Sequence, residues 1–207
     1  MKVYVESNFV LELALLQEQH ISCEEILRLA ESAGIQLAIP AYSLIEPYEA
    51  FIRHHQQRKR IKRDLDIEIR QIARTIDYGH RLHGFQDISA ILIDSAYEEA
   101  KRLELVRARL LKVAEVIPLE AEILVAAMQY QREHDFLPQD AVIYASILAN
   151  LDHSAPTIGC FLNRNSKDFD DPDIVEELKK KNCKLLPRFD SGYDYIRRFG
   201  SSNNQSA

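Results

Sequence analysis

Short apolar runs alternate with longer amphipathic stretches along this chain of 207 residues. The apolar runs at 3–5, 37–39, 157–162 and 184–186 predict four short strands. Apolar residues at helical spacing predict helices over 9–19, 24–32, 119–133, 140–150 and 172–181. Strands that alternate with helices are typical of an α/β fold, in which a parallel sheet is sandwiched between helices.

The middle of the chain is charged and rich in predicted helix. Ser43 to Glu46 reads as a capping box that opens a long helix. Further on, two long helices are predicted over 61–78 and 88–116, with a glycine-containing turn between them and Pro118 ending the second. An apolar stripe on the second helix is predicted to form the core of this hairpin. The stripe consists of Leu92, Ala96, Leu103, Val106 and Leu110.

The length fits a single domain over 1–190, with a helical insertion at about 51–118. Residues 191–207 form a C-terminal tail, and its polar end is predicted to be disordered. The three cysteines are widely spaced, which favours a reducing, cytoplasmic setting over a disulfide framework. Neither a signal peptide nor a membrane-spanning run is expected, because acidic residues interrupt the apolar stretches.

Four acidic residues stand beside predicted strands or helix starts. Glu6 follows the first strand, Glu46 and Asp140 lie near the first turns of helices, and Asp168 follows the third strand. Ligands bind beyond the carboxyl ends of parallel strands, so all four carboxylates can reach one edge of the sheet. Clustered carboxylates repel one another unless a cation is present, and Mg²⁺ or Mn²⁺ prefers oxygen ligands.

Most of these acids also have a structural explanation. Glu46 occupies the position of a capping-box glutamate, and Asp140 suits the positive end of a helix dipole. Asp168 belongs to an acidic cluster that could be a solvated loop, which leaves Asn165 as an alternative fourth site position. Glu6 directly follows an apolar strand, and this placement favours a functional role.

Four segments carry a family resemblance when they are taken together and in order. They are Glu6-Ser7-Asn8, Pro40 to Glu46, Asp140 to Ala145, and Asn163 to Phe169. Over about 1–49 and 137–187 the chain resembles the PIN-domain family of metal-dependent nucleases. The resemblance implies an endoribonuclease that uses Mg²⁺ or Mn²⁺ to hydrolyse RNA phosphodiester bonds. The implied catalytic metal ligands are Glu6, Glu46, Asp140 and Asp168, with Asn8 and Asn165 in support.

The sequence departs from the family pattern at two points. Glu6 stands where the family has aspartate, and the stretch between Glu46 and Asp140 is longer than in the compact toxin-type members. The alternative is therefore a catalytically inactive PIN-fold module that binds RNA or another protein. An antitoxin-like protein partner and a homo-oligomer both stay open.

One strongly basic run, from Arg53 to Arg63, stands out in a chain whose net charge is −6. Its cations are predicted to contact RNA phosphates, although a solvated helix face is an equally good explanation. No aromatic residue is interleaved, which disfavours recognition by base stacking. The predicted RNA-binding residues are Arg58, Lys59, Arg60, Lys62 and Arg63.

Overall fold

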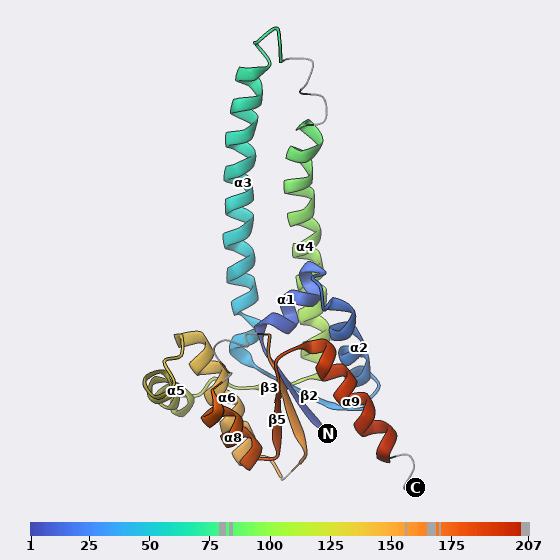
Figure 1. The fold of residues 1–207 in the computed structure, drawn as a ribbon, viewed down its shortest axis with the longest axis vertical. Coiled ribbons are helices and arrows are strands. Elements are labelled where there is room, and N and C mark those ends of the chain that lie inside the picture. Colours follow the sequence, from blue (N-terminus) through green and yellow to red (C-terminus); the bar gives the residue numbers. More distant parts are fainter. Residues whose placement is uncertain (79–81, 83–84, 156, 165–168, 170, 204–207) are drawn as a thin grey trace.

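A computed structural model describes residues 1–78, 82, 85–155, 157–164, 169 and 171–203. These residues form a parallel sheet of five strands in the order β3-β2-β1-β4-β5 (Figure 1). The strands are β1 (Lys2–Val5), β2 (Gln36–Pro40), β3 (Glu115–Ile117), β4 (Gly159–Leu162) and β5 (Cys183–Leu186). The predicted α/β class with a parallel sheet between helices is confirmed.

Helices cover both faces of the sheet, and the side chains of the central strand alternate between them. Val3 and Val5 of β1 enter one buried cluster, and Tyr4 enters the other. The first cluster includes residues of α1 (Ser7–Leu15), α2 (His20–Glu31) and α9 (Phe189–Asn203). The second includes residues of α5 (Ala121–Glu133), α6 (Pro138–His153) and α8 (Pro172–Lys180).

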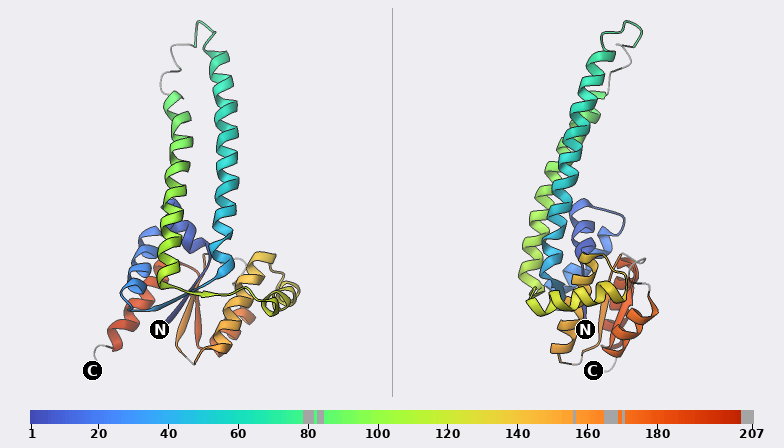
Figure 2. Two further views of the ribbon diagram at one scale, coloured as in Figure 1. Left: turned by 180° about the vertical axis from the view of Figure 1, so that it is seen from behind. Right: turned by 90° about the vertical axis from the view of Figure 1, so that its left-hand side faces the viewer.

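A helical hairpin made of α3 (Glu46–Ile72) and α4 (Phe85–Val113) extends well beyond the sheet (Figures 1 and 2). We call residues 52–72 and 85–100 of this hairpin the arm. The apolar stripe predicted on α4 divides between two environments. Leu103, Val106 and Leu110 are buried in the core beside the sheet, whereas Ala96 is buried within the arm. The predicted turn at Gly79 and Gly84 lies outside the described residues.

Two predictions around the hairpin are wrong. Ser43 does not cap α3, because it lies in a short 3₁₀ turn (η1, Ala41–Leu44), and α3 begins after Ile45 without a side-chain cap. Pro47 is the second residue of that helix, in the first turn, where it needs no partner for a backbone N–H group. Pro118 does not end α4 either, since the helix stops at Val113 and β3 follows before the proline.

Helix α9 changes the interpretation of the C-terminal tail. It covers most of residues 191–207, and Phe189 and Ile196 are buried on the sheet. The polar end was predicted to be disordered, but its first residues, up to Asn203, continue this helix, and 204–207 lie outside the described residues. By contrast, the predicted start of α8 is confirmed, because the side chain of Asp171 accepts a hydrogen bond from the backbone of Asp173 at 2.9 Å.

Two further observations concern cysteines and membranes. Cys23, Cys160 and Cys183 are buried free thiols. Among the described helices, none is both long enough and apolar enough to cross a bilayer.

Candidate active site

Glu6 lies at the carboxyl end of the central strand, where β1 turns into α1. Its side chain accepts a hydrogen bond from the backbone N–H of Asn8 at 2.7 Å and so caps the helix. Only 4% of Glu6 is exposed, and this burial raises the pKa of its carboxyl group to about 7. Hydrogen bonds from Asn8 and Arg164 oppose the shift, while the nearby charge of Glu46 adds to it.

Glu46 reaches the same edge from the first turn of α3. The hydroxyl group of Ser7 donates a hydrogen bond to its carboxylate. Ser7 directly follows Glu6, so this bond ties the start of α3 to the end of β1. Two of the four predicted carboxylates therefore lie close enough for one to influence the ionisation of the other.

Asp140 comes to this region from the first turn of α6 on the other face of the sheet. It is buried, with 8% of its surface exposed. Burial raises the pKa of the Tyr42 phenol in η1, and the charges of Glu46, Glu49 and Asp140 add to this shift. The sequence motifs did not indicate a role for this tyrosine.

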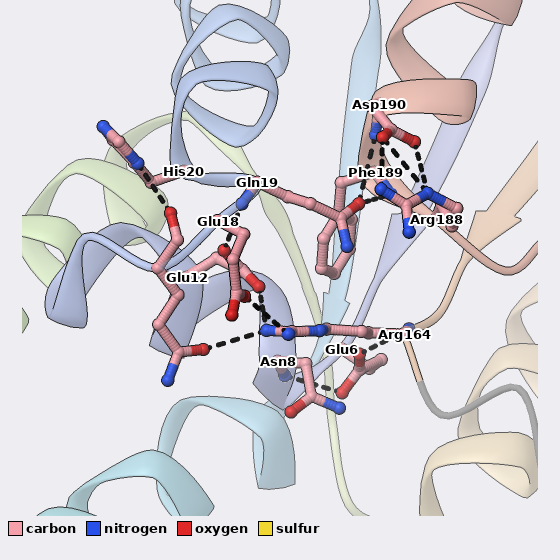
Figure 3. Close-up of polar contacts among 11 residues, drawn as sticks. Glu6, Asn8, Glu12, Glu18, Gln19, His20, Arg164, Arg188, Phe189 and Asp190 are labelled. Atoms are coloured by element: carbon pink, nitrogen blue, oxygen red, sulfur yellow. Dashed lines mark hydrogen bonds and ion pairs between the residues drawn. The ribbon is translucent and has the colours of Figure 1, made fainter.

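Arg164, two residues after the end of β4, organises the other side of the site (Figure 3). Its backbone N–H points to a carboxylate oxygen of Glu6 at 3.5 Å. Its guanidinium group forms an ion pair with the fully buried Glu12 of α1. The same group donates to the side chains of Gln17 at 3.0 Å and Glu18 at 2.6 Å. Arg164 thus holds the start of the segment after β4 against α1.

Glu12 is the one member of this arrangement that the sequence marks, since it lies one helical turn on from Asn8 and is predicted to support the site. Glu12 lies in a helix whose neighbouring residues Val10 and Leu13 are buried. A carboxylate in such a position requires a cation or several donors, because burying an unpaired charge is costly. Arg164 and the backbone N–H of Gln19, at 2.8 Å, meet this requirement.

The fourth predicted position cannot be compared with the others, because Asn165 and Asp168 lie outside the described residues. Within the described part of the chain, no three histidine, cysteine, aspartate or glutamate residues are grouped as metal ligands. The chemistry of Glu6, Glu46 and Asp140 nevertheless suits a hard divalent cation, which prefers oxygen ligands. The mutual repulsion of Glu6 and Glu46 is a second feature that a cation would relieve.

The predicted RNA-binding cations lie on α3, along the arm. Arg58 is bonded to Glu99 at 2.7 Å and to Ser95 at 3.3 Å, both on α4. Lys62 pairs with Asp66 at 2.5 Å on its own helix. Lys59 and Arg60 are exposed. RNA binding by this run stays a prediction.

Comparisons with known proteins give little further information. The sequence matches no protein-family model, and no curated protein resembles it in sequence. Among solved structures, a similar chain occurs in the crystal structure of VapBC2 from Rickettsia felis bound to a DNA fragment from their promoter. The two chains are 12% identical, the overlay covers 90% of this chain and 98% of that one, and the TM-score is 0.45. A similarity this distant carries no conclusion about activity.

Proposed function

We propose that this chain is a PIN-type endoribonuclease that requires Mg²⁺ or Mn²⁺. The carrying observation is the buried Glu6 at the end of the central strand, close enough to Glu46 for their charges to interact. Asp140, buried in the first turn of α6, is the third carboxylate proposed for the site, and its charge, like that of Glu46, raises the pKa of Tyr42. The resemblance of the four sequence motifs to the PIN-domain family supports the same activity.

In this proposal Glu6, Glu46, Asp140 and Asp168 hold the cation. When bound, such an ion neutralises phosphate charge and lowers the pKa of a water molecule that attacks the phosphodiester. The chain contributes the arrangement of its carboxylates. Ser7 orients Glu46 through its hydroxyl group, and the backbone N–H of Asn8 fixes one oxygen of Glu6. Asn165 is proposed as a supporting residue on the strength of the family resemblance alone.

A specific observation favours the inactive module as the second candidate. The described acids do not form a group of three metal ligands, and Glu6 and Glu46 each accept a hydrogen bond from α1. Glu6→Asp separates the two candidates by restoring the family's residue. A nuclease keeps or gains activity in this variant, whereas a module without catalytic function stays inert.

The deciding experiment incubates purified protein with labelled single-stranded RNA in Mn²⁺ and in EDTA. Cleavage is expected in Mn²⁺ alone, and Asp140→Asn should abolish it. Asp152→Asn is a matched control, because Asp152 lies near the other end of the same helix and pairs with Lys181 on the surface. Cleavage that persists in EDTA, or at the wild-type rate in Asp140→Asn, would contradict the proposal.

A further inference from the structure

The arm leaves a large part of its surface without a covering element. In all three ribbon views it extends beyond the sheet and the helices packed around it (Figures 1 and 2). Two helices that pack only on each other bury one stripe each and leave their remaining faces to solvent. Such a hairpin usually gains stability by packing against further helices, as in a four-helix bundle.

The exposed faces of the arm carry large apolar side chains on both helices. Ile61, Ile67 and Ile72 of α3 are each at least 40% exposed. On α4, Ile91 is 61% exposed and Tyr97 is 73% exposed. Single exposed apolar residues are ordinary on protein surfaces, but repeated ones on an isolated hairpin indicate a surface that another helix covers.

In the half of the arm nearer the sheet, basic and acidic residues are divided between the two helices. Between Arg53 and Arg63, α3 has six basic residues and no acidic residue. Between Ala90 and Ala100, α4 has three acidic residues and no basic residue. Among the described residues of the hairpin, the ion pair of Arg58 with Glu99 joins these two segments.

Several other charged side chains of these segments are exposed on the arm. Lys59 and Arg60 on α3, and Asp94 and Glu98 on α4, are all exposed. Over these segments each arm therefore presents a basic stretch of α3 beside an acidic stretch of α4, and further along α3 Asp64, Asp66 and Glu68 are acidic. A second copy of the same arm has matching charges. The basic stretch of α3 in one copy can face the acidic stretch of α4 in the other, and the same contact occurs again with the copies exchanged.

We propose that the arm is a dimerisation surface that packs against the arm of a second copy of this chain. The symmetry is self-consistent, since a two-fold axis makes the α3–α4 contact occur twice. At 1.5 Å per residue, the arm is about 30 Å long, and two helices side by side are about 20 Å wide. One face therefore buries roughly 600 Å² per copy, or about 1,200 Å² in total, which reaches the lower end of stable interfaces. This inference is independent of the nuclease activity.

The test exchanges charges between the two helices and measures mass by sedimentation equilibrium. The wild-type chain should have twice the monomer mass of 23.9 kDa. Lys59→Glu/Arg60→Glu replaces two exposed cations of α3 with acidic residues, and Asp94→Lys/Glu98→Lys replaces two exposed acidic residues of α4 with cations. Each variant alone should be monomeric, and an equal mixture of the two should regain the dimer mass. These side chains are exposed, so far-UV circular dichroism should show unchanged folding.

The matched control is Lys179→Glu/Lys180→Glu, the same charge change on α8 in the globular part of the chain. It should leave the dimer intact. The proposal is overturned if the wild-type chain is monomeric at 100 μM, or if the mixture stays monomeric. It is also overturned if Lys59→Glu/Arg60→Glu loses affinity for RNA while the mass stays that of a dimer, since the basic face then serves RNA.

Discussion

Arg164 and Glu12 form an ion pair between residues 152 positions apart, and the glutamate is fully buried. The pair joins the segment after β4 to the middle of α1. Glu6, at the start of α1, receives the backbone N–H of the same arginine. Arg164 thus links two strand ends that border the candidate site, through its guanidinium group and its backbone N–H.

Replacing Arg164 with alanine should destabilise the protein strongly. Glu12 would then be a buried carboxylate without its cation, which typically costs about 3 kcal/mol. The free energy of unfolding is measured by urea denaturation. Adding Glu12→Gln to Arg164→Ala should recover part of the loss, because a neutral amide is less costly to bury. Arg188→Ala serves as the control, since Arg188 pairs with Asp190 on the surface and its loss should change stability little. Equal losses in Arg164→Ala and Arg188→Ala would show that the buried pair has no special role.

The stability of the protein should fall as the pH rises from 5 to 7. The pKa of Glu6 is raised to about 7 in the folded chain, so the folded state holds a proton that the unfolded state has already released. The contribution of the Glu6 proton to the free energy of unfolding is therefore fully present below about pH 4.5 and is lost as the pH rises through 7. The shift corresponds to about 3 kcal/mol. Glu6→Gln should remove this dependence and be more stable than the wild type at pH 8. Parallel stability profiles for the two proteins between pH 5 and pH 8 would contradict the assignment.

Divalent metal should raise the melting temperature more at pH 8 than at pH 5.5. Binding to the folded state stabilises it by linkage, and the cation competes with the proton on Glu6. The measurement is a thermal melt in 5 mM Mn²⁺, compared with EDTA at each pH. Asp140→Asn should lose this stabilisation, while Asp152→Asn should keep it. A melting temperature that does not respond to Mn²⁺ at pH 8 would remove the support for a metal site.

Gly192→Ala should destabilise the packing of α9 on the sheet. A Cβ atom at this position would lie 2.5 Å and 2.9 Å from the two methyl carbons of Leu162. Leu162 is fully buried, so its side chain has little room to move, and such overpacking costs about 1–3 kcal/mol. Urea denaturation measures the loss, with Ser191→Ala as the exposed neighbouring control. A Gly192→Ala variant as stable as the wild type would show that α9 can shift away from Leu162 with no loss in the free energy of unfolding.

Much of the sheet could be predicted because β1, β2, β4 and β5 are apolar runs with clear boundaries. The positions of Glu6, Glu46 and Asp140 follow from the geometry of parallel strands and need no knowledge of distant contacts. β3 could not be recognised in the same way, since its three residues follow a long helix and pair only with β2 among the described strands. Its place in the sheet depends on the path of the hairpin, which local periodicity does not encode.

The parts of the site that escaped prediction depend on contacts between distant residues. Arg164 acquires its partners only when β4 lies beside β1, and nothing near it in the sequence marks Glu12 as its counter-ion. Ser43 shows the opposite case. Its local pattern fits a capping box, but the 3₁₀ turn after Pro40 takes it away from the helix start.

Glu46 is also the first residue of the helix that forms one side of the arm. With 27 residues, α3 is about 40 Å long, and its backbone hydrogen bonds run without a break from the site to the tip. A sideways movement of about 4 Å at the tip therefore corresponds to a tilt of about 6° at Glu46 if the helix moves as a rigid rod. Restraining the far end of the arm would limit this tilt and so keep the Glu46 carboxylate in its orientation toward Ser7. Contacts remote from the sheet would therefore influence the geometry of Glu46.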